Sequence, residues 1–309
     1  MILFLGIPSE PPMAMAIEAA RRGRHSATTL NQRHSHLADI ALDVGGDGEG
    51  LLCSQGRTRS LSEFRSVYVR TTEPRYLPEH QARGRRPPDP AALERADVFH
   101  DLLNQWLETT AAVVVNRPGA MATNMSKPYQ AQFALRVGFH TPPTLVTNDV
   151  AELEQFRATH GRLVYKSISS VRSIVQALTP DRASRLGLLR HLPTQFQSFV
   201  DGVNVRVHVV GHEVFATEIE TEAVDYRYAS RDGISITMRP FSLPVELADA
   251  CRRLSGDLRL PFTGIDLKRS SDGRWYCFEA NPSPAYSYYE GETGQPIADA
   301  LVRYLSSQP

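Results

Sequence analysis

Three side chains that commonly bind metal ions lie close together near the end of the sequence, namely Asp266, Glu279 and Asn281. Between them, Asp272-Gly273 is flanked by apolar runs, which is a strong signal for a two-residue hairpin turn. With that turn, cross-strand partners have residue numbers that sum to 545, as 272 and 273 do. Asp266 then lies opposite Glu279, with Cβ atoms about 4.5–5.5 Å apart. Asn281 shares the face of Glu279, because side chains alternate along a strand.

Two carboxylates placed opposite each other destabilise a sheet unless a positive charge lies between them. Two carboxylates and an amide oxygen suit Mg²⁺ that is bound partly through the phosphates of a nucleotide. The pattern therefore predicts a site for Mg-ATP. The alternative is that Asp266 and Glu279 are solvated charges on the surface of a sheet.

Further polar residues upstream supply positive charge, which phosphoryl chemistry needs together with correct positioning. They are Lys127, Lys166, Asn204, Arg206 and Arg227. A single lysine is also typical of a solvated surface, but Lys166 ends the apolar run Leu-Val-Tyr. Residues 203–210 contain valines at 203, 205, 207 and 209 that alternate with Asn204, Arg206 and His208, which predicts a strand whose polar face meets a ligand.

The first part of the chain reads as a small open α/β sheet. We expect a strand at 1–5, a helix at 11–22 that ends at Gly23, and strands at 51–53, 66–70 and 112–115. The loop after the first strand lacks the G-x-G-x-x-G spacing, so a dinucleotide site is not expected there. We place the N-terminal domain at residues 1–115.

The remaining sequence predicts a second α/β unit and then a third. We expect helices at 127–137 and 150–159, the latter capped by Asn148-Asp149, and strands at 144–146, 163–166, 174–177, 196–200 and 203–210. We place a central domain at residues 116–200 and a C-terminal domain, which carries the predicted metal site, at residues 201–309.

Composition limits the kinds of partner. The 309 residues are 41% hydrophobic and 22% charged, and 34 basic side chains balance 34 acidic ones. Nothing in this balance favours nucleic acid or an anionic membrane as a partner. Three cysteines without C-x-x-C spacing indicate reduced thiols, and no segment resembles a signal peptide or membrane span. We expect a soluble cytoplasmic protein.

These motifs resemble the ATP-grasp superfamily, and within it the RimK-type and microviridin-type peptide ligases. The matching pieces are SKPYQAQFALRVGFHTPPTLVTND (126–149), LVYKSIS (163–169), FQSFVDGVNVRVHVVGHEVFATEI (196–219), DYR (225–227), GIDL (264–267) and FEANPSPAYSYYEGETGQPIADAL (278–301). The resemblance covers roughly residues 115–305. It implies an α/β (α+β) ATP-grasp fold preceded by an N-terminal open α/β domain.

The resemblance also implies roles for particular residues. Those it assigns to the nucleotide are Lys127, Lys166, Gln197, Phe199, Val200, Asp201 and Asn204. The two lysines would contact phosphates, the strand from Gln197 to Val200 would hold adenine through its backbone, and Asp201 or Asn204 would approach the ribose.

For the chemical step, the resemblance implies that Arg206 neutralises phosphate or an acyl phosphate, and that Asp225 and Arg227 meet the acceptor or acyl substrate. Asp266, Glu279 and Asn281 would bind Mg²⁺, in agreement with the hairpin argument. A surface ion pair in a loop anchored by Tyr226 and Tyr228 is the alternative for Asp225 and Arg227. The chain departs from many relatives at residues 167–173, where no glycine-rich loop is present.

The activity implied is an ATP-dependent ligase that forms an amide or ester through an acyl phosphate and requires Mg²⁺. A peptide is the favoured substrate and the N-terminal domain the natural place for leader recognition, with a free amino acid or small metabolite as the alternative. The resemblance also suggests a homo-oligomer. Two other readings remain open, an ATP-grasp phosphotransferase and a catalytically silent ATP-binding regulatory protein.

Overall fold

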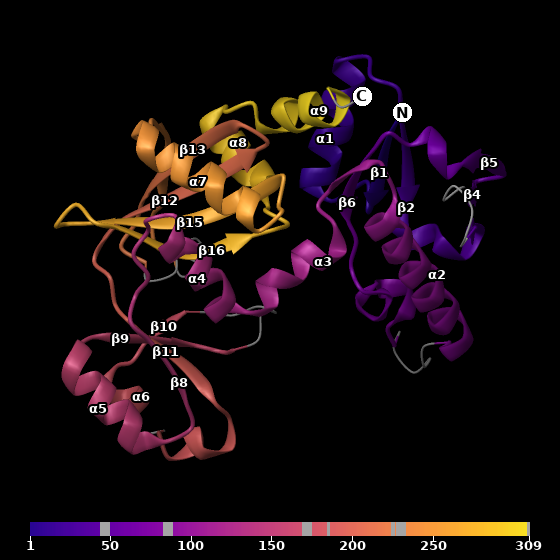
Figure 1. Cartoon of the computed structure of the whole chain (residues 1–309). Coiled ribbons are helices and arrows are strands. Elements are labelled where there is room, and N and C mark those ends of the chain that lie inside the picture. The colour runs from indigo at the N-terminus through magenta and orange to yellow at the C-terminus, as the bar shows by residue number, and fades with distance from the viewer. Residues whose placement is uncertain are drawn as a thin grey trace.

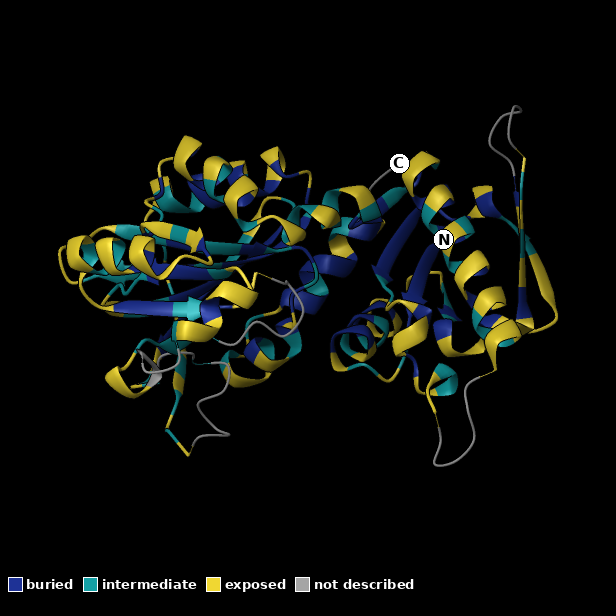
Figure 2. Ribbon diagram, turned by 90° about the horizontal axis from the view of Figure 1, so that it is seen from below, coloured by how far each residue is buried: buried dark blue, intermediate teal, exposed yellow. Residues whose placement is uncertain are grey.

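The computed structural model of the chain describes residues 1–43, 50–82, 89–168, 175–183, 186–223, 226 and 233–307. Its strands form four sheets, and three of them with their covering helices make up the main body of the molecule (Figure 1). The inner strands of the sheets are the most deeply buried elements, whereas the outer faces of the helices are exposed (Figure 2). No helix among the described residues is both long enough and apolar enough to cross a membrane.

The N-terminal sheet is parallel, with strand order β2-β1-β6-β7. Its strands span Ala27–Asn31 (β2), Ile2–Gly6 (β1), Ser66–Arg70 (β6) and Val113–Val115 (β7). Helices α1 (Pro11–Arg22) and α2 (Pro90–Thr109) cover it. Alternate residues of β1 enter two different cores, so both faces of this apolar strand are buried. The helix expected at 11–22 and the strand expected at 66–70 are confirmed.

A small antiparallel sheet, β3-β4-β5, lies beside the N-terminal sheet. Its strands span Ala38–Leu42, Gly50–Ser54 and Arg57–Ser60. The sequence indicated only the middle strand, because the outer two, ADIAL and RTRS, contain few large apolar residues.

The second main sheet is antiparallel, with strand order β10-β9-β11-β8. Its strands span Gln176–Ala177 (β10), Leu163–Lys166 (β9), Thr194–Ser198 (β11) and Thr144–Thr147 (β8). Helices α5 (Val150–His160) and α6 (Pro180–Ala183) belong to this unit. The Asp149 carboxylate accepts a hydrogen bond from Ala151 N at 2.7 Å, so the expected helix cap is confirmed. The strand expected at 196–200 ends earlier, at Ser198.

The third main sheet has five antiparallel strands in the order β14-β13-β12-β15-β16. They span Thr237–Phe241 (β14), Glu213–Glu220 (β13), Gly202–Val210 (β12), Phe262–Ser270 (β15) and Trp275–Asn281 (β16). Helices α4 (Lys127–Arg136) and α7 (Val245–Asp257) pack on the face that carries the valines of β12. Helices α8 (Tyr286–Thr293) and α9 (Ile297–Ser306) join this sheet to α1 of the N-terminal unit, and α3 (Pro118–Met121) precedes α4.

The hairpin of β15 and β16 confirms the pairing of Asp266 with Glu279, but the two-residue turn is wrong. Ser270 N donates to Arg274 O at 2.9 Å, so the turn contains three residues and ends at Gly273, whose φ is +82°. The register is therefore shifted by one next to the turn. A bulge at Phe278, which lies between the partners of Leu267 and Asp266, shifts it back.

The expectation that the polar face of β12 meets a ligand is only partly correct. The alternation of residues 203–210 is present, but Arg206 and His208 are 4% and 0% exposed, because α8 covers that face. Only Asn204, at the start of the strand, reaches a cavity. Only the first residue of this polar face is therefore available to a ligand in the cavity.

Candidate active site

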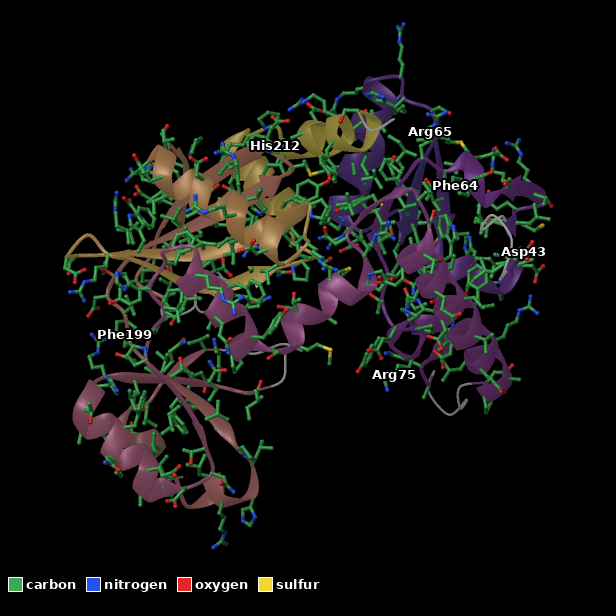
Figure 3. All side chains as sticks on the ribbon, in the orientation of Figure 1. Asp43, Phe64, Arg65, Arg75, Phe199 and His212 are labelled. Atoms are coloured by element: carbon green, nitrogen blue, oxygen red, sulfur yellow. The ribbon has the colours of Figure 1, made fainter. Side chains whose placement is uncertain are left out.

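A cleft lies between the second and third main sheets. Figure 3 places Phe199, in the link from β11 to β12, where these two units meet. The sequence-predicted residues that line the cleft are Lys127, Lys166, Gln197, Phe199, Val200, Asn204, Asp266 and Glu279. Residues separated by up to 152 positions in the chain are thus brought to one place, as the ion pair of Lys127 with Glu279 shows.

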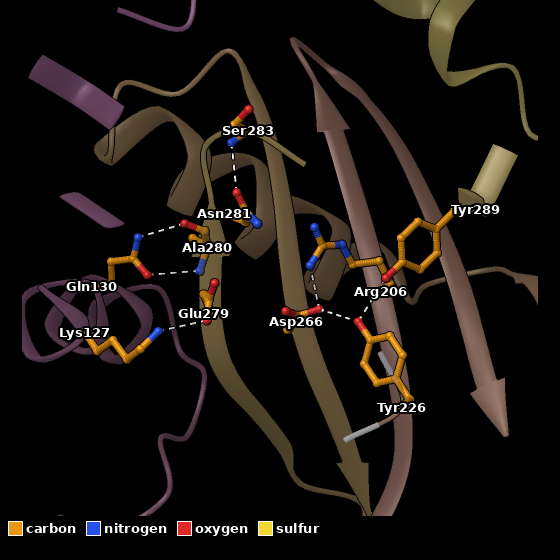
Figure 4. Close-up of polar contacts among 10 residues, drawn as sticks. All are labelled: Lys127, Gln130, Arg206, Tyr226, Asp266, Glu279, Ala280, Asn281, Ser283 and Tyr289. Carbon is orange, nitrogen blue, oxygen red and sulfur yellow. Dashed lines mark hydrogen bonds and ion pairs between the residues drawn. The ribbon is translucent and has the colours of Figure 1, made fainter. Parts of the chain in front are cut away.

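The two carboxylates form the centre of a row of charged side chains across the third sheet. Arg206 on β12 lies opposite Asp266 on β15, which in turn lies opposite Glu279 on β16. Lys127 at the start of α4 completes the row, with its Nζ 3.0 Å from Glu279 Oε2. Each carboxylate therefore has a cation on its outer side, which offsets the repulsion between the two (Figure 4).

Asp266 accepts hydrogen bonds from an arginine and a tyrosine among the described residues. Arg206 Nη1 donates to Asp266 Oδ1 at 2.6 Å, and Tyr226 OH donates to the same oxygen at 2.9 Å. Burial alone would lower the pKa of Arg206, but Asp266 and the neighbouring tyrosines raise it above its usual value. Burial raises the pKa of Tyr226 well above its usual value, so the phenol stays a hydrogen-bond donor.

Glu279 and Lys127 are aligned by a residue that the sequence did not single out. Gln130 Nε2 donates to Ala280 O at 2.7 Å and Gln130 Oε1 accepts from Ala280 N at 3.1 Å. Gln130 thus fixes α4 to the backbone of β16, one residue from Glu279. Lys127 precedes Gln130 by three residues and so lies on the same face of the helix. That spacing is the signal that could have identified Gln130.

Two more cations line the cleft. Lys166, at the end of β9, is 7% exposed, as expected for the end of an apolar run. Lys268 was not predicted, although alternation along β15 places it on the face of Asp266. Its Nζ donates to Val200 O at 3.1 Å and lies 5.5 Å from the centre of the Phe199 ring. Burial lowers the pKa of Lys268.

Several predicted residues do not line the cleft. Asp201 is exposed and its carboxylate lies 3.5 Å from Arg162 Nη1, so Asn204 is the one of the two ribose candidates that the cleft contains. Arg206 and Asn281 do not line the cleft either: Arg206 is bonded to Asp266, and Asn281 lies two residues beyond Glu279 on β16. Asp225 and Arg227 lie outside the described residues, as do positions 169–173 of the segment without glycines.

The residues present fit a magnesium ion bound with a nucleotide. Asp266 and Glu279 supply carboxylates, and Asn281 Oδ1 accepts a hydrogen bond from Ser283 N at 2.9 Å, which leaves the second lone pair of that oxygen for a metal. Within the part of the chain that the structure describes, no group of three or more His, Cys, Asp or Glu side chains is placed to hold a metal. Two carboxylates and one amide oxygen leave part of the octahedral shell of Mg²⁺ for phosphate oxygens or water.

Solved structures of ATP-grasp ligases match the fold over nearly the whole chain. The ligase PsnB in complex with a minimal precursor gives a TM-score of 0.82 at 24% identity, covering 99% of this chain and 98% of that chain. The macrocyclase MdnC of Microcystis aeruginosa MRC, bound with the precursor peptide MdnA, gives 0.81 at 19% identity, covering 99% of both chains.

A third match is the RiPP-associated ATP-grasp ligase of Chryseobacterium gregarium in complex with ADP and a leader and core peptide. Its TM-score is 0.80 at 20% identity, covering 100% of this chain and 97% of that chain. No protein-family profile and no curated protein matches the sequence. The chain has the ATP-grasp fold, and the fold class expected from the sequence is confirmed.

Proposed function

We propose that the protein is an ATP-dependent ligase that joins a carboxylate to an amine or hydroxyl and releases ADP and phosphate. The observation that carries this proposal is the cleft itself, in which three lysines and two neighbouring carboxylates converge between the two sheets of an ATP-grasp fold. The substrate carboxylate attacks the γ-phosphate of ATP to give an acyl phosphate. The acceptor then displaces phosphate from it.

The side chains have distinct tasks in this scheme. Lys127 and Lys166 bind the phosphates and neutralise their charge, while the segment from Gln197 to Val200 holds adenine through its backbone. Magnesium, when bound by Asp266, Glu279 and Asn281, supplies charge stabilisation for the phosphates. Solved structures of PsnB contain Mg and ADP, which supports the same cofactor set here.

A peptide is the proposed substrate. The similar structures named above contain precursor peptides, and this likeness supports a peptide as the source of the carboxylate, the acceptor or both. The free amino acid considered from the sequence remains the alternative for one partner. A cytoplasmic location and a homo-oligomeric state are parts of the same proposal that rest on the resemblance alone.

The proposed domain boundaries are residues 115/116 and 200/201. The strands on either side of each boundary support it, because β7 and β8 belong to different sheets, as do β11 and β12. Helix α4 lies in the proposed central domain but packs against β16 of the C-terminal one. Limited proteolysis with fragment mass determination would test both boundaries.

The experiment that tests the ligase proposal follows ADP release and product mass. Purified protein is incubated with Mg-ATP, peptides encoded beside its gene and a panel of free amino acids. We expect acceptor-dependent ADP and a product whose mass equals donor plus acceptor less one water. AMP and pyrophosphate would exclude this chemistry, and a phosphorylated product that survives hydroxylamine would identify a phosphotransferase instead.

Two matched double variants test whether ADP release depends on the carboxylates of the cleft. The double substitution Asp266→Asn, Glu279→Gln removes both cleft carboxylates and should abolish ADP release. The control, Glu246→Gln with Asp257→Asn, removes two exposed carboxylates of α7 and should leave ADP release unchanged. Equal loss in both would show that the effect does not come from the cleft.

A further inference from the structure

The segment after the predicted metal ligand Asn281 has the sequence Pro282-Ser283-Pro284 before α8 begins at Tyr286. Proline has no backbone N–H, so Pro282 and Pro284 can be held by hydrogen bonds only through their carbonyl oxygens. Both carbonyls accept hydrogen bonds. One donor is the last residue of a strand in the N-terminal sheet, and the other directly follows a strand of that sheet.

The first donor is Asn116, which follows β7. Its Nδ2 donates to Pro282 O and to Phe262 O, each at 2.6 Å, and its Oδ1 accepts from Phe262 N at 3.1 Å. Asn116 is 2% exposed. One buried amide therefore ties the segment after Asn281 to the first residue of β15, the strand that carries Asp266.

The second donor is Arg70, the last residue of β6. Its Nη1 donates to Pro284 O at 3.0 Å, while Nε and Nη2 donate to the two carboxylate oxygens of Glu10 at 3.0 and 2.5 Å. The Arg70 side chain is 8% exposed. Glu10 thus fixes the orientation of the guanidinium, and the guanidinium fixes the position of Pro284.

These contacts act on Asn281 from close range. The Asn281 side chain is oriented by Ser283 N, which lies between the two anchored prolines. We propose that Asn116 and Arg70 are positioning residues that hold the Asn281 oxygen where the metal binds, so that the N-terminal sheet helps to build the metal site. The inference rests on the proposed Mg-ATP function and assigns a role in it to residues outside the cleft.

A purely structural role for these two residues makes a different prediction. If they only attach the N-terminal unit to the rest, their loss should weaken stability and all ligand binding together. If they position Asn281, their loss should lower the affinity for the metal and leave metal-free nucleotide binding unchanged. Residues that orient metal ligands typically contribute about 10- to 100-fold to metal affinity.

The test uses the full chain and Mn²⁺ as a spectroscopic probe. Binding of Mn²⁺ in the presence of saturating ADP is measured by electron paramagnetic resonance, and binding of ADP in EDTA by calorimetry. The variants are Arg70→Lys, which keeps the charge beside Glu10 but loses the forked donor, and Asn116→Asp, which replaces the amide donor with an acceptor. The control is Arg33→Lys, because Arg33 pairs with Glu79 and not with the anchored segment.

We expect Mn²⁺ affinity to fall about 10-fold in both variants and less than twofold in the control, with ADP affinity in EDTA unchanged in all three. Unchanged Mn²⁺ affinity in the folded variants would overturn the inference, as would a parallel loss of metal-free ADP binding. A wild-type protein that binds no Mn²⁺ with ADP would overturn the proposed function itself. If Asn116→Asp does not fold, Arg70→Lys decides the question.

Discussion

Gly264 occupies a position where a single added methyl group should disturb the charged row of the cleft. It lies on β15 between His208 of β12 and Asn281 of β16. A Cβ at this position would overlap Arg206 Nη2 and would lie 2.6 Å from Arg206 Cζ and 2.7 Å from Pro284 Cβ. The φ of Gly264 is not in the left-handed region, so the requirement for glycine is one of space.

The size of the effect follows from these distances. Ordinary contact begins at 3.4 Å, so Arg206 Cζ would have to retreat by at least 0.8 Å, the difference between 3.4 and 2.6 Å. A retreat of that size along the bond would lengthen the 2.6 Å hydrogen bond to Asp266 to about 3.4 Å, beyond the usual range. Overpacking costs about 1–3 kcal/mol, and the reduced entropy of the unfolded chain returns about 0.4–1 kcal/mol. We expect Gly264→Ala to lower the free energy of unfolding by about 1–2 kcal/mol.

Urea unfolding followed by circular dichroism measures this loss. Gly256→Ala is the matched control, because its added Cβ would have no neighbour within 4 Å apart from the nearby backbone of its own helix, and we expect it to stabilise α7 by about 0.5–1 kcal/mol. With Arg206→Lys, which lacks the forked end, the cost of Gly264→Ala should shrink. The same cost in both backgrounds, or a gain like that of Gly256→Ala, would refute the overlap with Arg206.

Three further predictions concern His208, Gln130 and Lys268. Burial first, and the charge of Arg206 second, hold the pKa of His208 well below 6.5, so between pH 6.5 and that lowered pKa the unfolded chain takes up this proton and the folded chain does not. As the pH is lowered through this range, the free energy of unfolding should fall by up to about 1.4 kcal/mol per pH unit. His208→Phe should remove this contribution, which urea unfolding at pH 5 and pH 7 measures. Gln130→Leu leaves the backbone of Ala280 without its partners and should lower the free energy of unfolding by about 2–4 kcal/mol in the same assay, with no loss refuting the role of this amide. Lys268→Met removes the hydrogen bond to Val200 O and should weaken ATP binding about fivefold, as measured by calorimetry. An unchanged affinity would show that Lys268 does not contribute to nucleotide binding.

The pairing of Asp266 with Glu279 could be predicted from the sequence, although for a partly wrong reason. The Asp272-Gly273 signal located the hairpin, but the three-residue turn and the bulge at Phe278 each shift the register by one residue in opposite directions. A bulge depends on how a strand fits its neighbours and leaves no mark in a period-two pattern. The prediction was correct because the two shifts cancel.

Other parts of the site could not be predicted, because they depend on contacts between distant segments. Gln130 meets Ala280 across 150 positions, and Asn116 meets Phe262 across 146. An amide in a helix or after a strand has no local signature of such a partner. His208 was misread for the same reason, since the alternation of β12 is visible in the sequence but its cover by α8 is not.

The most direct test of the central claim is calorimetric titration of Mg-ATP into the wild-type protein and into the double variant Asp266→Asn, Glu279→Gln. The account predicts saturable binding to the wild type that requires Mg²⁺, and strongly reduced binding to the variant, since both carboxylates lie in the cleft beside Lys127 and Lys166. Equal Mg-dependent binding to both proteins would contradict it, because the metal and nucleotide would then bind elsewhere.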